Sequence, residues 1–290
     1  MVSNLRGKEL QRYISIKRNQ IFENIKTART RYINEWVIDE TAYSSAEHYK
    51  WMATFVSGYA RILEIGVGSG CGTLALAGEG HTVIGIDENP VCIERASTRL
   101  TDKGYKVKTI LRGEVHPVAG EDYYDLKYKN IRHQMTDEQI LLVEGCIPYD
   151  SRLYQWLLSL QPFDAVVCWL IGSHQARHAD RNVIRQNIQT PHEYRLSVQN
   201  PTFELASRVL RSGGILNIID RGKPDNSSLF LQCRREQASP TGLLVDERTD
   251  VRQFDKVQGG AGMCQMYDGV NIQPVIDEKM FFLSTVCKMP

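Results

Sequence analysis

The most constraining feature of the sequence is a short apolar run that stops at three alternating glycines. Residues 61–65 read Arg-Ile-Leu-Glu-Ile and lead into Gly66, Gly68 and Gly70. Small and helix-forming residues follow at 73–77, so the segment predicts a strand, a tight turn and a helix start. Glycines can adopt positive φ, and the free N–H groups of a helix start favour negative charge. The turn is therefore expected to hold a ligand.

A second apolar strand, residues 82–86, ends in Asp87. A carboxylate at this spacing from the glycines is suited to accept hydrogen bonds from ribose hydroxyl groups. A dinucleotide fingerprint would need a third glycine at position 71, where the chain has Cys71. The alternating glycines preceded by Glu64 instead resemble the first motif of the class I S-adenosylmethionine-dependent methyltransferases.

This resemblance implies an α/β fold. The family has a seven-stranded, mostly parallel, Rossmann-like sheet with helices on both faces and an antiparallel last strand. It implies S-adenosylmethionine as the cofactor, S-adenosylhomocysteine as the product, and Glu64 as the acid that faces the methionine ammonium. The cofactor-binding residues expected on this basis are Glu64, Gly66, Val67, Gly68, Gly70, Asp87, Glu88, Cys146, Ile147 and Cys168.

The resemblance divides the chain into a helical N-terminal cover, residues 1–57, and a methyltransferase domain, residues 58–290. Apolar residues at helical spacing between 8 and 37 predict one or two amphipathic helices, and another helix is expected at about 45–57. Leading helices often cover the cofactor pocket in the resembled family. Eight Lys or Arg against two Glu precede residue 34, a pattern we interpret as a solvated helix face.

Two segments compete for the third parallel strand. One is 107–112, followed by Glu114, and the other is 140–143, followed by Cys146. We favour the second segment because it is more apolar and leads through a helix into the fourth strand, so that about 105–139 would form a β insertion containing a hairpin. Cys146 then replaces the Asp that commonly accepts from the adenine amine, and adenine would depend on backbone groups such as the Ile147 N–H. Under the first assignment Glu114 would hold the amine.

The fourth strand, residues 163–170, resembles the Phe-Asp-x-Val strand of the family, after which the chain normally lines the methyl group and the substrate. His174 and His178 follow it and are the candidate catalytic residues, since a histidine beside the methyl group could take a proton from the acceptor. The alternative is that both are ordinary loop histidines. Their spacing also occurs in metal sites, but with no third ligand nearby we predict no metal.

The acceptor is expected to be an oxygen or nitrogen atom, on a small molecule. Segments at about 171–200 and 248–279 are expected on the substrate side, and neither the Asn/Asp-Pro-Pro-aromatic signature nor the paired glutamates of arginine methyltransferases occur. A protein acceptor and transfer of an aminopropyl-type group are weaker alternatives. Cys146 motivates a further alternative, a non-catalytic partner or S-adenosylmethionine sensor that keeps the fold.

Composition agrees with an enzyme of the cytoplasm. Charged residues make up 24% of the chain, the net charge is +1, and the seven cysteines form no C-x-x-C pair. With no long apolar span and no signal-peptide pattern, no membrane association is predicted. Nucleic acid is an unfavoured partner, and the oligomeric state is open, with a homodimer as one option.

Overall fold

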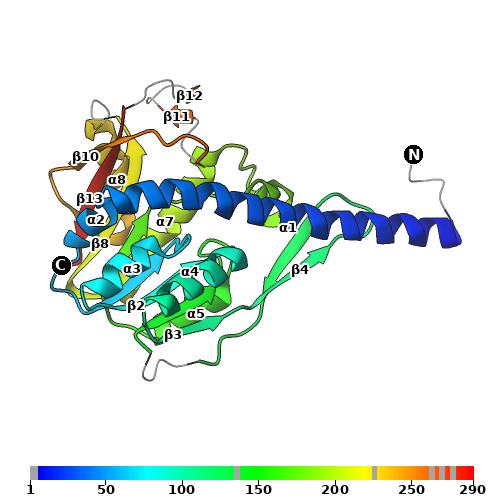
Figure 1. The fold of residues 1–290 in the computed structure, drawn as a ribbon, viewed down its shortest axis with the longest axis horizontal. Helices are drawn as coiled ribbons and strands as arrows, with labels where there is room; N and C mark the ends of the chain where they lie inside the picture. The colour runs from blue at the N-terminus through cyan, green and yellow to red at the C-terminus, as the bar shows by residue number, and fades with distance from the viewer. Residues whose placement is uncertain (1–5, 134–137, 224–226, 261–264, 268–271, 275–278) are drawn as a thin grey trace.

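A nine-stranded sheet forms the centre of the molecule (Figure 1). The computed structural model describes residues 6–133, 138–223, 227–260, 265–267, 272–274 and 279–290. The strand order is β10-β13-β8-β7-β1-β2-β6-β3, with β9 paired to β13. The strands of this sheet are β1 (Arg61–Ile65), β2 (Thr82–Asp87), β3 (Val107–Ile110), β6 (Ile140–Glu144), β7 (Phe163–Trp169), β8 (Leu210–Gly222), β9 (Leu244–Val245), β10 (Asp250–Asp255) and β13 (Lys279–Lys288).

The centre of the sheet is parallel, because helices return the chain between successive strands. β1 pairs in parallel with β2 and with β7, β2 pairs with β6, and β7 pairs with β8. These strands are nearly continuous apolar runs, as expected for strands that are buried on both faces. The connecting helices are α3 (Cys71–Gly78), α4 (Pro90–Asp102), α5 (Ser151–Ser159) and α7 (Pro191–Val209).

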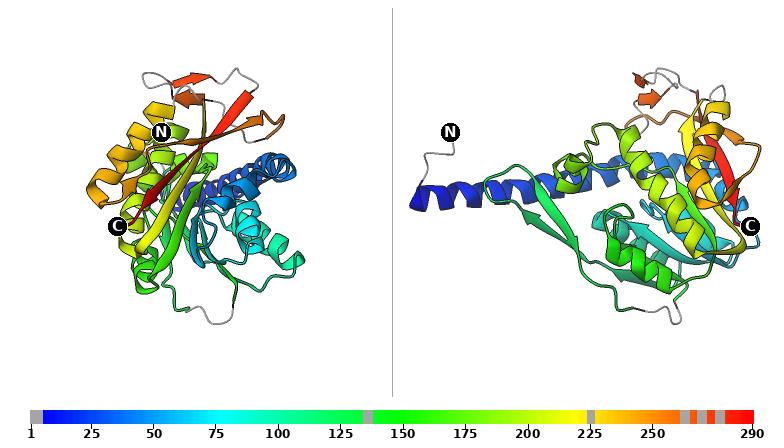
Figure 2. Two further views of the ribbon diagram at one scale, coloured as in Figure 1. Left: turned by 90° about the vertical axis from the view of Figure 1, so that its left-hand side faces the viewer. Right: turned by 180° about the vertical axis from the view of Figure 1, so that it is seen from behind.

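Helices cover both faces of the sheet (Figure 2). Side chains alternate along each strand, so that Ile62 packs on the face covered by α1 (Gly7–Ser45), α2 (His48–Thr54) and α3, whereas Leu63 packs on the opposite face. That opposite face is covered by α5, α7 and α8 (Ser227–Ala238). The predicted α/β architecture with helices on both faces is confirmed.

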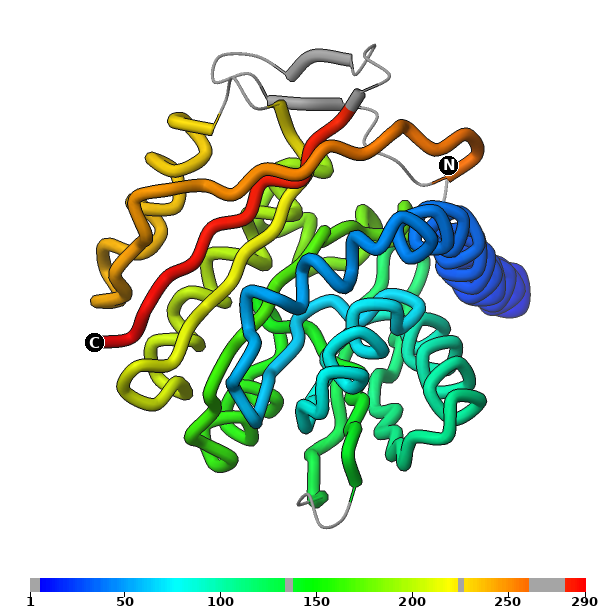
Figure 3. Tube along the Cα trace, turned by 60° about the vertical axis from the view of Figure 1, so that its left-hand side comes forward, coloured from blue at the N-terminus to red at the C-terminus, as the bar shows by residue number. Residues whose placement is uncertain are grey.

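The antiparallel last strand is also confirmed. β13 runs antiparallel between β8 and β10, and the three strands can be followed side by side in Figure 3. The sheet has more strands than the seven expected, and β3 explains part of the difference. Residues 140–144 do occupy the predicted place beside β2, but 107–110 form a further parallel strand on the outer side of β6 and are not part of a hairpin. Both candidate segments are therefore strands of the main sheet.

The inserted hairpin is formed by β4 (Gly113–Pro117) and β5 (Tyr124–Tyr128), which pair only with each other. It packs against the first half of α1, a single helix of 39 residues whose N-terminal turns extend beyond the body of the molecule (Figures 1 and 2). Ile21 and Ile25 of α1 lie in one apolar cluster with hairpin residues such as Tyr124 and Leu126. The hairpin therefore supports the helix at a distance from the sheet.

The segment after β7 is largely helical. It contains the 3-10 turn η2 (Gln175–Ala179) and α6 (Arg181–Arg185), and α7 begins at Pro191. Thr190 and Glu193 form a reciprocal capping box at the start of α7.

The remaining short elements are η4 (Ser239–Thr241) and the strand pair β11 (Gln265–Tyr267) and β12 (Ile272–Pro274). Within the described ranges, no helix has the length and apolar character needed to span a bilayer.

Candidate active site

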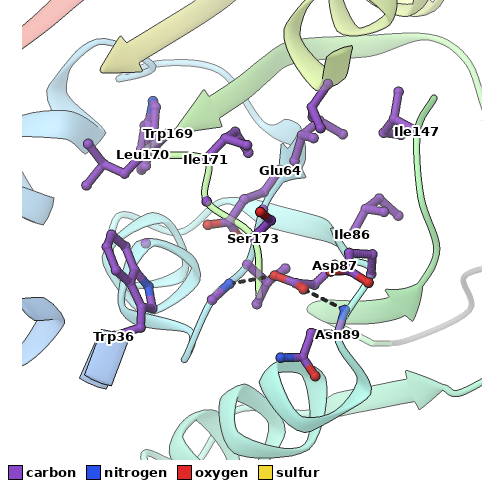
Figure 4. Close-up of a pocket in the computed structure, with 18 of the residues that line it drawn as sticks. Trp36, Glu64, Ile86, Asp87, Asn89, Ile147, Trp169, Leu170, Ile171 and Ser173 are labelled. Carbon is purple, nitrogen blue, oxygen red and sulfur yellow. Dashed lines mark hydrogen bonds between the residues drawn. The ribbon is translucent and has the colours of Figure 1, made fainter. Parts of the chain in front are cut away.

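A cavity of about 770 Å³ lies at the carboxyl ends of β1, β2, β6 and β7 (Figure 4). This edge of a parallel sheet is where ligands bind in open α/β folds. Its wall combines the glycine turn, the segments after β2, β6 and β7, and residues of α1, α2 and α7. The lining residues are Tyr32, Trp36, Glu40, Tyr49, Glu64, Ile65, Gly66, Val67, Gly68, Gly72, Ile86, Asp87, Glu88, Asn89, Gly145, Cys146, Ile147, Pro148, Trp169, Leu170, Ile171, Gly172, Ser173, Tyr194 and Val198.

The glycine turn has the predicted conformation, but its N–H groups are already occupied. Gly66, Gly68 and Gly70 have φ of 87°, 57° and 87°. The Gly68 N–H donates to Asp87 Oδ2 at 2.9 Å, and the Ser69 N–H donates to the Glu40 carboxylate at 3.2 Å. The other three N–H groups of residues 66–70 donate to backbone carbonyls, those of Ile86 and Val67. The sequence-based expectation concerned the N–H groups of the helix start, where α3 begins at Cys71, and these five hydrogen bonds do not involve them.

Asp87 occupies the place predicted for the ribose-binding carboxylate. Its Oδ1 accepts the Asn89 N–H at 2.9 Å, and its Oδ2 accepts the Gly68 N–H, as the dashed lines in Figure 4 show. Burial raises the pKa of Asp87 to about 7, although the two N–H groups act in the opposite direction. Each oxygen keeps one lone pair, so the carboxylate can still accept hydrogen bonds from a ligand.

Glu64 points from β1 toward the face covered by α1, α2 and α3. It is 2% exposed, and its Oε2 accepts the Thr73 hydroxyl at 2.6 Å. Burial raises the pKa of Glu64 to about 8, with Thr73 opposing the shift and the charges of Glu40 and Asp87 adding to it. A buried carboxyl with this pKa indicates that the protein supplies it with no cation of its own.

One side of α1 forms the cover of the cavity. Tyr32, Trp36 and Glu40 are spaced by four residues and therefore share one helix face, which all three turn to the cavity. A Cβ atom on Gly68 would lie 2.7 Å from Trp36 Nε1, and one on Gly172 would lie 2.5 Å from the Tyr32 hydroxyl. Glycine is required at both positions because the cover helix approaches so closely.

Sequence reasoning missed these three residues as site residues. Tyr32 and Trp36 lie among the apolar residues that predict an amphipathic helix, and helical spacing places Glu40 on the same face without saying what that face contacts. Further lining residues that we did not predict come from α2, the start of α4 and the end of β7. They are Tyr49, Asn89, Trp169 and Leu170. The lining residues Ile171, Gly172, Ser173, Tyr194 and Val198 lie in the segment 171–200 that was expected on the substrate side.

Cys146 and Ile147 lie on the cavity wall after β6, as expected. The Cys146 thiol is not free, because Arg177 Nη2 donates to its sulfur at 3.3 Å. Glu114 lies on the hairpin, is exposed, and pairs with Lys129 at 2.8 Å. The structure therefore does not bring Glu114 to the cavity, and the alternative adenine contact fails.

The candidate catalytic histidines do not line the cavity. His174 is 2% exposed, and its Nε2 lies 3.1 Å from Glu88 Oε1. His178 is exposed on η2. Burial favours neutral Glu88, but the charges of His174 and Arg177 outweigh it and hold the pKa of Glu88 well below its usual range. His174 thus holds a lining carboxylate in place from behind the wall, and no group of three or more metal-ligating side chains forms among the described residues.

Two of the expected cofactor residues also fall outside the lining. Cys168 is paired in register with Ile65, and both side chains point to the face packed by α5 and α7. The prediction for Cys168 is therefore contradicted by the parity of the strand. Gly70 faces α4, since a Cβ atom there would lie 2.8 Å from the Ala96 Cβ. Its glycine serves the close packing of α3 against α4.

Residues 62–144 match a family model described as a methyltransferase domain. The match contains the glycine turn, Glu64 and Asp87, all in the geometry described above. This segment of the chain is a methyltransferase domain. The family uses S-adenosylmethionine, which leaves S-adenosylhomocysteine as the product. The methyltransferase match ends at Glu144, so α1, β7 and α7 contribute to the cavity from outside it.

Comparison with curated protein sequences gives no match. Solved structures similar to this chain include a SAM-dependent methyltransferase from Agrobacterium tumefaciens, at 12% identity and a TM-score of 0.45, with 84% of this chain and 62% of that chain covered. Precorrin-6y C5,15-methyltransferase from Geobacter metallireducens is similar at 11% identity and a TM-score of 0.42, with 83% of this chain and 87% of that chain covered. Precorrin 8w decarboxylase from Methanobacterium thermoautotrophicum is similar at 15% identity and a TM-score of 0.40, with 81% of this chain and 88% of that chain covered. Similarity at this level carries no information about the acceptor.

Proposed function

We propose that the protein transfers the methyl group of S-adenosylmethionine to an oxygen or nitrogen atom of a small molecule. The observation that carries this proposal is the closure of the cavity by α1, which packs against Gly68 and Gly172. The wall is built from α1, α2, the strand ends and α7, and the cavity must hold the donor as well. Enclosure from several elements favours an acceptor small enough to enter the cavity as a whole.

The wall residues fit the donor by their chemistry. When bound, S-adenosylmethionine supplies a methyl group on a sulfonium, an excellent leaving group. We assign Glu64 to the ammonium of its methionine end, Asp87 to the ribose hydroxyls, and the wall at Cys146 and Ile147 to adenine. A Cβ atom on Gly66 would lie 2.6 Å from Ile171 Cδ1, so glycine at this position lets the segment after β7 pack against the turn.

The acceptor side of the wall favours alignment of the nucleophile over its deprotonation by histidine. No histidine is among the lining residues of the described chain, but Tyr32 and Ser173 are. Burial, with the charges of Cys92, Asp87 and Glu40 adding to it, raises the pKa of Tyr32 well above its usual value, so the phenol keeps its proton. A neutral phenol can orient a hydroxyl or amine, and orientation is the main requirement for an in-line displacement.

The proposal is tested in two steps. Calorimetry with S-adenosylmethionine and S-adenosylhomocysteine should show binding of both. Incubation with radiolabelled S-adenosylmethionine and a lysate separated by size should then place the label in the low-molecular-weight fraction. Label in the protein or nucleic-acid fraction alone would refute the small-molecule acceptor while leaving methyl transfer intact.

A non-catalytic sensor is the second candidate function, and Cys146 favours it. The thiol stands where the family commonly has an acid, and Arg177 engages it. The sensor predicts tight donor binding with no label in any lysate fraction. The division into a cover, residues 1–57, and a methyltransferase domain, residues 58–290, is likewise a proposal, supported by the start of the family match at residue 62.

A further inference from the structure

Glu40 is an acid of the cavity wall that no motif of the sequence marks. It lies on α1 and is 2% exposed. Its carboxylate accepts the Ser69 N–H, at 3.2 Å for each oxygen, and also the Ser69 hydroxyl. A carboxylate from the cover helix therefore sits directly on the glycine turn, beside Gly68.

All charged residues that line the cavity are acids. They are Glu40, Glu64, Asp87 and Glu88, and no Lys, Arg or His accompanies them in the described part of the wall. Glu88 is balanced by His174 and Arg177, and Asp87 accepts two N–H groups. Glu40 and Glu64 have no Lys, Arg or His beside them in the described wall, although the charge of Arg99 acts on Glu40.

Burial raises the pKa of Glu40 to about 7, with the Ser69 hydroxyl, Arg99 and other donors opposing the shift. Glu64 shows the same effect to a larger degree. A ligand cation placed between two such acids would favour their ionised forms and would be bound strongly in return. Both acids border the glycine turn, since a Cβ atom on Gly68 would lie 2.8 Å from Glu40 Oε1 and one on Gly72 would lie 2.6 Å from Glu64 Oε1. The charge of Glu40 accordingly adds to the pKa shift of Glu64.

Tyr49 is a third buried polar group of this wall. It is 5% exposed and lines the cavity. Burial raises the pKa of Tyr49 well above its usual value, so the hydroxyl stays neutral and keeps an oxygen that can accept a hydrogen bond. The charges of Glu40 and Glu64 both act on it, and all three groups line the same cavity.

The backbone of the turn points to the charge of that ligand group. Each N–H of residues 66–70 has an acceptor within the protein. The turn therefore presents carboxylate oxygens to the cavity in place of free N–H donors. An ammonium suits this arrangement, and a carboxylate does not.

We propose that Glu40 and Glu64 together bind the ammonium group of the donor's methionine moiety, with the Tyr49 hydroxyl as a third acceptor. This inference rests on the proposed function, because it takes S-adenosylmethionine as the donor. It makes the cover helix part of the donor site. Glu40 and Tyr49 would then recognise the amino-acid end and leave the nucleoside to the β1–β2 side.

The test combines one substitution with one truncated ligand. S-Adenosylhomocysteine carries the ammonium, whereas 5′-methylthioadenosine keeps the nucleoside and lacks the amino-acid end. In calorimetry, Glu40→Gln should weaken S-adenosylhomocysteine by about tenfold to a hundredfold and leave 5′-methylthioadenosine unchanged, since a hydrogen-bonded charge is lost for the first ligand only. Tyr49→Phe should weaken the first ligand by about threefold to tenfold, again without effect on the second.

Glu35→Gln is the matched control, because Glu35 lies on the same helix in a half-exposed pair with Arg31. It should change neither affinity. An equal loss of both ligands in Glu40→Gln would assign Glu40 to the packing of the cover and overturn the proposal, as would an unchanged affinity for S-adenosylhomocysteine. Wild-type protein that binds neither ligand would instead refute the proposed function.

Discussion

The two sides of the cavity have different origins. The side formed by the glycine turn and Asp87 comes from one continuous segment, lies within residues 62–144, and is held by short-range hydrogen bonds. The opposite side comes from α1, the end of β7 and α7, which meet only in the folded chain. The difference teaches that the glycine-turn side of the site is built on a local motif, whereas the enclosure of the cavity depends on the tertiary docking of α1.

The largest effect is expected for a substitution in the glycine turn, on the side of the cavity that is built from residues 62–144. Gly68→Asp should lower the affinity for S-adenosylhomocysteine by more than about a hundredfold, because it adds an unpaired buried charge beside Glu40. Calorimetry measures the loss. Gly104→Asp is the control, since Gly104 has a similar φ of 86° with no atom within 4 Å of a Cβ position. Retained affinity in Gly68→Asp would mean that the donor does not lie on the turn.

The next effect concerns the docked side. Trp36→Ala should reduce the free energy of unfolding by about 3–5 kcal/mol, as is usual for a large aromatic side chain removed from a core. Trp36 is 5% exposed and belongs to the cluster that joins α1 to the sheet. Urea denaturation measures the change, with Ile38→Ala, 42% exposed on the same helix, as the control. A loss below 1 kcal/mol would show that α1 is a loosely held flap.

Titration of the wall acids sharpens the comparison further. The pKa values of Glu40 and Asp87 are raised to about 7 and that of Glu64 to about 8. The first two carboxyls therefore ionise around pH 7 and the third around pH 8, so the range to examine is about pH 6 to 8.5. Affinity for S-adenosylhomocysteine should therefore rise by about tenfold over this range. Calorimetry across the range tests this, and an affinity that falls with pH would contradict it.

The same shifts give the sign of the pH dependence without ligand. Because these carboxyls ionise more readily in the unfolded chain, they oppose folding once the pH exceeds their unfolded value of about 4.5. Stability of the ligand-free protein from this source should decline until about pH 8 and then level off. Saturating S-adenosylhomocysteine should flatten the decline, which thermal unfolding at several pH values can establish.

The smallest effect separates positioning from catalysis. His174→Asn should weaken S-adenosylhomocysteine by about threefold, because the wall residue Glu88 loses the imidazole that lies 3.1 Å from its carboxylate. Turnover at saturating donor should stay unchanged, since His174 does not reach the cavity. Steady-state kinetics decides the matter, and a large fall in kcat would restore His174 to the chemistry. His178→Asn, an exposed neighbour, is the control.

The local side of the site could be predicted from the sequence because its contacts are local. Glu64, Gly68 and Asp87 lie within 24 residues of one another, so their types and spacing nearly define the geometry. The same holds for the parallel centre of the sheet, whose apolar runs and helix signals alternate. The place of residues 140–144 beside β2 followed from apolar content and from the helix that comes after it.

The other side could not be predicted, for physical reasons that differ by residue. Tyr32 and Glu40 reach the cavity only because α1 docks across the sheet, and helical spacing does not say which face docks where. His174 pairs with Glu88, which is 86 positions away, so its burial depends on the whole fold. Cys168 is the exception, because counting alternate residues from Glu64 through the register of β1 and β7 would have placed it on the opposite face.

The hydrogen bonds inside the glycine turn have one more consequence. Each N–H of residues 66–70 already has an acceptor in the protein. The backbone of the turn therefore needs no hydrogen bond from a bound small molecule to reach its native conformation. A newly made chain can complete this region during folding, in the absence of its donor. The concentration of the donor in the cell would then determine the fraction of molecules with bound donor, and not the fraction of molecules that folds.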